Sequence, residues 1–294
     1  MLTIDPKETS LGQMHGLLLG AVAPRPIAFA STIDKEGHVN LSPFSFFNAF
    51  SAAPPIVVFS PARRGRDATT KDTLDNVLQV SEVVINIVNY PIVQQMSLSS
   101  TEYDKGVNEF DKAGLTEVPS ERVAPPRVGE SPASFECKVL EIKSMGEHGG
   151  AGNLVICEVL LAHFDERIID ENGKIDPFKL DAVARMGGNW YARAQGDVLF
   201  EIPKPLSAIG IGVDQIPDHI KNSHFLSGND LGQLGTIGRL PTSEEIEKFK
   251  NSSEGKKLFE NSTDPDFEKQ LHLRAKEYIA KGDVTIAWKV LSII

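Results

Sequence analysis

The sequence has few of the residues on which several classes of function depend. Its two cysteines, Cys137 and Cys157, form no CxxC pair, so neither a disulfide framework nor a zinc cluster is expected. The seven histidines are scattered and no HExxH occurs, so no metal site is predicted. Thirty lysines and arginines against 40 acidic residues give a net charge of −10. This charge disfavours nucleic-acid binding, which needs a basic face.

Long apolar runs and the common catalytic motifs are also missing. No segment approaches the roughly 20 apolar residues that span a bilayer, and the N-terminus carries Asp5 and Glu8 in place of an apolar signal region. We therefore expect a cytoplasmic protein without a membrane partner. GxSxG and Walker A sequences are absent, and Gln215 replaces the third glycine of a GxGxxG fingerprint after Gly210 and Gly212. No catalytic side chain is assigned.

Short extended runs separated by turn signals dominate the first two thirds of the chain. Strands are expected in two hairpins, over 26–47 and 134–164, and in the apolar runs 55–60 and 82–89. Leu74, Val77 and Leu78 predict a short helix within 71–80. Because hairpin turns connect the strands, without βαβ crossovers, the pattern favours a closed or partly closed antiparallel barrel.

The last third of the chain has a different character. LSAIGIGV (206–213) is one more strand candidate, and the residues after 214 read as helices, with an N-cap signal at Thr242 and Ser243. We predict a barrel domain over 1–205. A mostly helical extension is expected over 206–294, packed on the barrel or on a partner subunit.

Residues 61–76 combine positive charge with hydroxyl groups. Arg63, Arg64, Arg66 and Lys71 precede a predicted helix N-terminus, where free N–H groups and the helix dipole favour an anion such as a phosphate monoester. The alternative is a solvated basic loop in which Thr70 or Asp72 caps the helix. This segment by itself leaves both interpretations open.

The stretch NLSPFSFFNAFSAAPP (40–55) does not alternate like an ordinary half-buried strand, because both faces mix rings or aliphatic groups with small polar residues. A planar aromatic ligand needs apolar groups against its face and polar groups at its rim. The alternative is a strand between two cores with satisfied serines. Together with the basic segment that follows, the stretch indicates a phosphorylated aromatic cofactor.

Several of these motifs resemble one known family. PRPIAFASTIDKEGHVNLSPFSFFNAFSAAPP, KDTLDN, EVVINIV, NEFDKAGLT, SPASFECKVLEI and ARMGGNWYAR are similar, in order and spacing, to segments of the flavin reductase-like proteins, which include the flavoredoxins. The resemblance implies a mainly β fold: an antiparallel, Greek-key-like split β-barrel with short helices, here followed by the helical C-terminal extension. It also implies a homodimer that binds one FMN per subunit near the interface.

The resemblance also assigns site residues by position. The flavin ring and ribityl chain would be lined by Ser31, Thr32, Ser42, Pro43, Phe44, Ser45, Phe46, Phe47 and Asn48. The phosphate would be held by Ser60, Arg63, Lys71, Asp72, Thr73 and Asn76. Arg185, Gly187, Gly188 and Tyr191 would approach the flavin from the same chain or its partner. His15 is expected to be an ordinary surface residue, and Arg25 part of a strand entry.

The activity implied by the resemblance is carried by the cofactor. NADH or NADPH would pass a hydride to N5 of FMN, while the protein orients both rings. An oxygenase or another redox protein would take the electrons. Two alternatives are an FMN electron carrier that does not oxidise nicotinamide, and an assembly module that has lost its cofactor.

Overall fold

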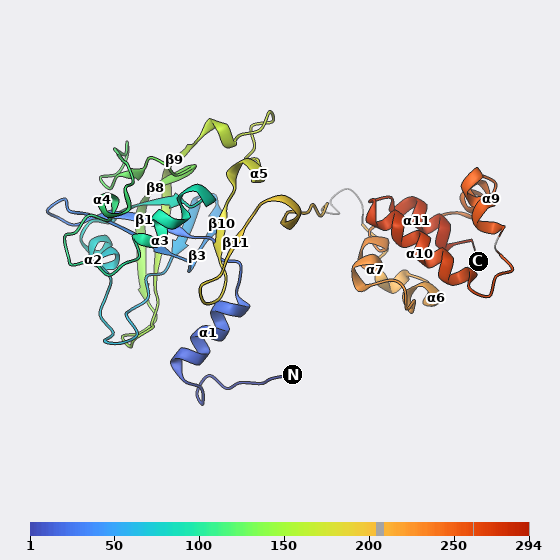
Figure 1. Ribbon diagram of the computed structural model, residues 1–294, viewed down its shortest axis with the longest axis horizontal. Helices are drawn as coiled ribbons and strands as arrows, with labels where there is room; N and C mark the ends of the chain where they lie inside the picture. Colours follow the sequence, from blue (N-terminus) through green and yellow to red (C-terminus); the bar gives the residue numbers. More distant parts are fainter. Residues whose placement is uncertain (204–208, 261, 294) are drawn as a thin grey trace. The chain divides into compact units, whose positions relative to one another are not determined.

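The computed structural model describes residues 1–203, 209–260 and 262–293, which form two compact units, Met1–Phe200 and Glu201–Ile294 (Figure 1). Each unit has its own hydrophobic core and is described by itself. Within the described ranges, no helix has both the length and the apolar character needed to cross a membrane.

The first unit is built on one sheet of seven strands. The strands are β1 (Ala28–Ile33), β2 (Val39–Phe44), β3 (Phe47–Ala52), β4 (Pro55–Phe59), β5 (Glu82–Ile87), β8 (Ala133–Ser144) and β9 (Asn153–Phe164). Their order is β2-β1-β5-β8-β9-β4-β3, and each neighbouring pair is antiparallel. The predicted antiparallel β fold, with hairpins at β1–β2 and β8–β9, is confirmed.

Short helices and two small sheets complete this unit. They are α1 (Leu11–Ala21), α2 (Asp72–Gln79), α3 (Val93–Leu98), α4 (Glu109–Ala113), α5 (Pro177–Leu180), the β6–β7 pair (Glu117–Val118 and Arg127–Val128) and the β10–β11 hairpin (Val183–Arg185 and Tyr191–Arg193). Helix α2 lies within the predicted range; its Leu74 and Val77 are buried, whereas Leu78 is exposed. Helix α1 buries none of its residues.

The sheet is covered on both faces, which explains why β1 is almost continuously apolar. Ala28 and Ala30 belong to a core that includes residues of α2, while Ile27 and Phe29 belong to a second core with residues of α3 and α4. A strand buried on both faces has no polar side and therefore shows no alternation.

The stretch 40–55 alternates poorly because it is two strands with a break between them. Strand β2 ends at Phe44 and β3 begins at Phe47, at the opposite end of the sheet order. Leu41 and Phe44 are buried on different faces of β2, whereas most of β3 is exposed. An alternation pattern read through the whole stretch therefore mixes residues of a buried strand with residues of an exposed one.

The second unit is helical. Its helices are α6 (Asp218–Lys221), α7 (Gly228–Leu234), α8 (Ser243–Lys250), α9 (Ser253–Phe259), α10 (Phe267–Ala280) and α11 (Val284–Leu291). Trp288 is buried in their common core, and its indole N–H donates to the Leu234 carbonyl at 2.9 Å. Thr242 caps α8 in a capping box with Glu245, so the predicted N-cap is confirmed.

The strand predicted over 206–213 lies partly outside the described residues. Residues 209–212 form no strand, so this prediction is wrong for them. The N–H groups of Ile211 and Gly212 instead donate to the carbonyls of Ile237 and Gly235. A Cβ at Gly210 would stand 2.4 Å from the Gly235 carbonyl oxygen. Close backbone packing therefore accounts for the glycine that resembled part of a dinucleotide fingerprint.

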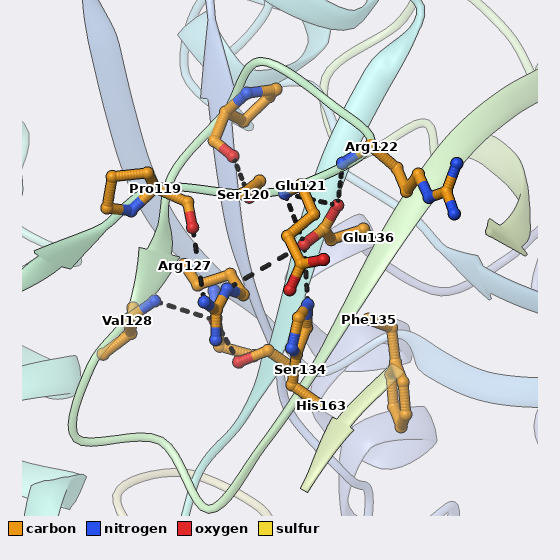
Figure 2. A network of polar contacts seen from close by, with 12 residues as sticks. Pro119, Ser120, Glu121, Arg122, Arg127, Val128, Ser134, Phe135, Glu136 and His163 are labelled. Carbon is orange, nitrogen blue, oxygen red and sulfur yellow. Dashed lines mark hydrogen bonds and ion pairs between the residues drawn. The ribbon is translucent and has the colours of Figure 1, made fainter. Parts of the chain in front are cut away.

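A buried carboxylate fixes the proline-rich loop that precedes β7 onto the sheet (Figure 2). Glu136 of β8 is fully buried and accepts hydrogen bonds from the backbone N–H groups of Glu121 and Arg122 and from Nε2 of His163 on β9. Burial by itself would raise the pKa of Glu136, but these hydrogen bonds outweigh it and hold the pKa below its ordinary value.

Candidate cofactor site

The basic loop over 61–70 is braced by the glycine turn between β8 and β9. The Arg63 N–H donates to the Ala151 carbonyl at 2.9 Å, and the Gly150 N–H donates to the Arg63 carbonyl at 3.0 Å. A Cβ at Gly149 would stand only 2.7 Å from the Gly65 carbonyl oxygen. The glycines therefore let two backbones pack directly against each other. The sequence marked them only as a hairpin turn.

The start of helix α2 is open to an anion. Lys71 is at the N-cap position, and no side chain caps the helix. The alternative in which Thr70 or Asp72 caps it is therefore wrong; the Thr70 hydroxyl instead donates to the Asp75 carboxylate at 2.7 Å. The helix dipole and the uncapped N–H groups favour negative charge at this end.

Lys71 stands beside an aromatic ring without a carboxylate partner among the described residues. Its Nζ lies 5.3 Å from the centre of the Phe44 ring. Burial lowers the pKa of Lys71, and the nearby positive charge of Arg64 lowers it further. Glu102 partly offsets this effect, while its carboxylate pairs with Arg64 and Arg66. A bound anion would relieve the repulsion between the cations.

Four polar side chains next to Lys71 hold one another in place. The Asn76 amide donates to the Thr32 hydroxyl at 3.1 Å, and the Asn40 amide donates to the Thr73 hydroxyl at 2.8 Å. Thr32, Thr73 and Asn76 are all buried. Their side chains hydrogen-bond to one another and join α2 to β1 and β2. The backbone N–H groups at the start of α2 are therefore better placed than these side chains to donate to a bound anion. Asp72 itself is half-buried beside them.

Ser31 and Thr32 were assigned to one site, but their side chains point to opposite faces of β1. Thr32 meets Asn76 of α2, whereas Ser31 follows Phe29 on the face toward α3 and α4. The Ser31 hydroxyl is buried and has no hydrogen-bond partner among the described residues. Only one of these two side chains can therefore face a given ligand.

A cavity of about 390 Å³ lies beside the break between β2 and β3. Pro43 and Ser45 line it together with Arg185 and Tyr191 of the β10–β11 hairpin. The structure thus brings these four predicted residues together within one chain. The Arg185 guanidinium lies 4.6 Å from the Tyr191 ring centre and donates to the Gly188 carbonyl at 2.8 Å. We call this space the Arg185 cavity.

The other residues of the 42–48 segment have diverse surroundings. Phe44 is buried and packs on Phe59 at 5.5 Å between ring centres, and Phe47 is half-buried against the same core. Phe46 is exposed beside the ring of His15. Asn48 is exposed, and its side chain accepts from the next backbone N–H. Ser42 is half-buried in β2, on the same face as Phe44.

Ser60 and Arg25 have structural contacts. The Ser60 hydroxyl accepts from the backbone N–H of Asn153 at 3.0 Å, at the base of the glycine turn. Arg25 is buried and donates to the carbonyls of Leu19, Val22 and Met186, which joins the end of α1 to the β10–β11 hairpin. The strand-entry role expected for Arg25 stays a prediction.

Asp34, Glu36 and His38 offer ligand atoms within 4.8 Å of one another at the β1–β2 turn. One Asp34 oxygen accepts from the N–H groups of Glu36 and His38, and the other pairs with His38 Nδ1 at 2.9 Å. The carboxylate thus helps to close the turn of the predicted hairpin over 26–47. We assign no metal to this group.

The donors around Lys71 suit a phosphate monoester. Lys71 supplies an unpaired ammonium group, and α2 supplies uncapped N–H groups. The buried Nε of Arg63 has no hydrogen-bond partner in the part of the chain that the structure describes. Such a set can bind a doubly charged anion without displacing any existing ion pair of Lys71 or Arg63.

Known structures place this fold in one class. Component B of nitrilotriacetate monooxygenase from Bacillus cereus is 31% identical, with a TM-score of 0.64, over 69% of this chain and 98% of that chain. A protein assigned as a flavin reductase with a split-barrel domain, from Shewanella frigidimarina, is 25% identical, with a TM-score of 0.58, over 69% of this chain and all of that chain. The first unit is a split β-barrel of this class.

The sequence comparison identifies the family. Residues 20–178 match the family described as flavin reductase like domain. An uncharacterized protein of Aquifex aeolicus is 38% identical over 196 residues, which are 67% of this chain and 97% of that protein. The chain therefore belongs to the flavin reductase-like family, as its motifs predicted. The second unit, from Glu201, lies outside the matched range.

Proposed function

We propose that this protein is an NAD(P)H-dependent FMN oxidoreductase of the flavin reductase type. The observation that carries the proposal is the pairing of an uncapped, cation-rich helix start at Lys71 with the break between β2 and β3, where Ser45 is half-buried and Phe46 is exposed. These features are joined by the short segment that ends β2, since Lys71 lies over Phe44.

In this proposal, Lys71, Arg63 and the first N–H groups of α2 hold the phosphate, and the residues after Phe44 contact the ring. FMN, when bound, supplies the chemistry: it accepts a hydride from nicotinamide and passes the electrons on. The protein binds and orients the reactants. The braced loop at Gly149 keeps the phosphate donors in place, so less ordering is needed on binding.

We further propose a homodimer, as the family resemblance implies. Phe46 is 40% exposed and Phe50 is 68% exposed near the break between β2 and β3. Helix α1 adds exposed Leu17 and Leu18, and its residue His15 contacts Phe46. Burial of these groups against a second copy would remove apolar surface from water beside the flavin segment.

The electron acceptor in this proposal is a separate oxygenase or redox protein in the cytoplasm. The Bacillus cereus neighbour is by name one component of a monooxygenase, which supports a partner of this kind. Cys137 and Cys157 are buried, free thiols, which suits a reducing compartment.

The test is the visible spectrum of the purified protein saturated with FMN, recorded anaerobically before and after addition of NADH or NADPH. We expect the oxidised flavin bands to bleach with at least one nucleotide. A protein that binds FMN, but is reduced by neither nucleotide and only by dithionite, would be an electron carrier. A protein that does not bind FMN would be neither, and the assembly-module alternative would then stand.

A further inference from the structure

The β10–β11 hairpin carries two arginines that stack on tyrosines but differ in charge balance. Arg193 lies 3.8 Å from the Tyr90 ring centre, and Asp181 neutralises it through contacts of 2.7 and 2.8 Å. Arg185 stacks on Tyr191, yet its guanidinium meets no carboxylate in the described ranges and donates only to a backbone carbonyl. The hairpin therefore contains one paired and one unpaired cation.

A second positive charge lies near Arg185. The pKa of Arg25 is lowered by burial and by the charge of Arg185. Arg25 is committed to three backbone carbonyls, so it is not available to a ligand. Two neighbouring cations without an anion raise the local positive potential, and a ligand carboxylate would reduce it.

The lining of the Arg185 cavity is mainly polar, with a small apolar part. Ile27 and Met96, which are almost fully buried, supply some of that apolar area, and Ser45, Ser97 and Ser100 supply hydroxyl groups. Its volume of about 390 Å³ is near the lower end of the range of ligand pockets, about 300–1,000 Å³, so a single-ring ligand suits it better than a dinucleotide. An adjoining space of about 200 Å³ shares Ser97 and Tyr191.

We propose that the Arg185 cavity binds a small aromatic carboxylate as a second ligand of the flavin site. The planar guanidinium of Arg185 would hold the carboxylate by two parallel hydrogen bonds. The ring would rest among Ile27, Met96 and Tyr191, next to Ser45 of the segment assigned to the flavin. The role of this ligand rests on the proposed function, but its binding can be measured without FMN.

Trp190 gives a direct probe, because it is 76% exposed between the cavity residues Asn189 and Tyr191. Benzoate and the neutral, similarly shaped benzamide would be titrated into the flavin-free full-length protein while tryptophan fluorescence is recorded. The protein has only one other tryptophan, the buried Trp288, and a Trp190→Phe variant identifies the source of the signal. We expect benzoate to bind at least tenfold more tightly than benzamide.

Variants of the two arginines separate charge recognition from structure. Arg185→Gln should abolish the preference for benzoate, and Arg185→Lys should retain part of it. Arg193→Gln, the matched change at the paired arginine, should retain it fully. Equal binding of benzoate and benzamide, an unchanged preference in Arg185→Gln, or inorganic phosphate that competes with benzoate at similar concentration would each overturn the proposal.

The same titration with FMN-saturated protein, followed by flavin absorbance, keeps the two proposals apart. If the protein does not bind FMN but still prefers benzoate to benzamide, the proposed function is wrong and the carboxylate site is supported. If the protein binds FMN and the bound FMN is reduced, but benzoate is not preferred to benzamide, the carboxylate site is wrong and the proposed function is supported.

Discussion

The two units of the chain differ in how their charged groups are satisfied. In the described part of the second unit, the two arginines are paired with glutamates: Arg239 with Glu245, and Arg274 with Glu254 and Glu277. In the first unit, Arg63, Arg185 and Lys71 have no carboxylate partner among the described residues, although each is half-buried. Unpaired, partly buried arginines are costly to maintain, so Arg63 and Arg185, which have no counterpart among the described arginines of the second unit, indicate that the first unit is the ligand-binding part.

The largest expected effect tests whether the second unit is needed for the site. Trp288→Ala would remove the largest fully buried side chain and should lower the free energy of unfolding of the second unit by about 3–5 kcal/mol. Because the first unit has its own cores, its thermal transition and its affinity for FMN should not change. Calorimetry of the full chain and FMN titration measure both quantities.

Leu273→Ala is the control for this change, because Leu273 is on α10 of the same unit but is 44% exposed. It should alter neither transition by more than about 0.5 kcal/mol. If Trp288→Ala weakened FMN binding as strongly as it destabilised its own unit, the contrast between a binding unit and a non-binding unit would be wrong.

The next effect concerns the buried carboxylate network of Figure 2, whose members include none of the residues proposed to bind FMN. Glu136→Gln should lower the free energy of unfolding of that unit by about 3 kcal/mol at pH 7, because it replaces a charged acceptor that is hydrogen-bonded to buried donors. FMN affinity should stay unchanged. Chemical denaturation with a probe specific to the first unit measures the loss.

The pH dependence gives a second check on Glu136. Its pKa in the folded protein lies below the ordinary value of 4.5, so its stabilisation is fully present above that value. The stabilisation is lost as the pH falls through the folded pKa. The difference in stability between wild type and Glu136→Gln should therefore be constant from pH 7 to about pH 5 and shrink below about pH 4. A difference that grows on acidification would contradict this assignment.

The features that could be predicted from the sequence are those that depend on residues close together in the chain. The hairpins, helix α2 and the cap at Thr242 were predicted because alternation, turn residues and capping residues act within a few positions. Most of the candidate site came from a family resemblance. Residue patterns by themselves left the basic loop and the phenylalanine-rich stretch ambiguous, because the evidence that separates the interpretations is in distant contacts.

Two features were out of reach for that reason. The split of 40–55 into β2 and β3 depends on which strands each one joins, and β3 pairs with β4 at the far edge of the sheet. The packing of Gly149 on Gly65 joins loops far apart in the chain. The opposite directions of Ser31 and Thr32, in contrast, were within reach of the sequence, because side chains alternate along the strand that was expected there.

A smaller effect tests the unpaired lysine directly. Lys71→Ala should weaken FMN binding by about 10- to 100-fold, since a hydrogen bond to a charged group contributes about 1.5–3 kcal/mol. Riboflavin, which lacks the phosphate, should bind equally well to both proteins. Flavin fluorescence titration at fixed ionic strength gives the two affinities.

Lys250 in the second unit is the matched control for Lys71. It also stands beside a ring, 5.7 Å from the centre of Phe259, but it has an acidic partner in Glu247 at 3.4 Å. Lys250→Ala should leave FMN affinity unchanged. The absence of an ion pair would not identify the phosphate site if both variants lost the same affinity for FMN. The same would follow if Lys71→Ala weakened the binding of riboflavin as much as the binding of FMN.

The smallest expected effect tests whether the glycine turn positions the basic loop. Gly149→Ala would place a Cβ 2.7 Å from the Gly65 carbonyl oxygen, and backbone on both sides must shift to accommodate it. We expect FMN affinity to fall by about fivefold to tenfold, because Arg63 is hydrogen-bonded to this turn. Gly65→Ala is the control in the same contact, since a Cβ at Gly65 meets nothing within 4 Å. An equal loss in both variants would mean that glycine flexibility, and not the close approach, sets the affinity. An unchanged affinity in Gly149→Ala would show that the phosphate donors do not depend on this brace, and that Lys71 and the start of α2 act without it.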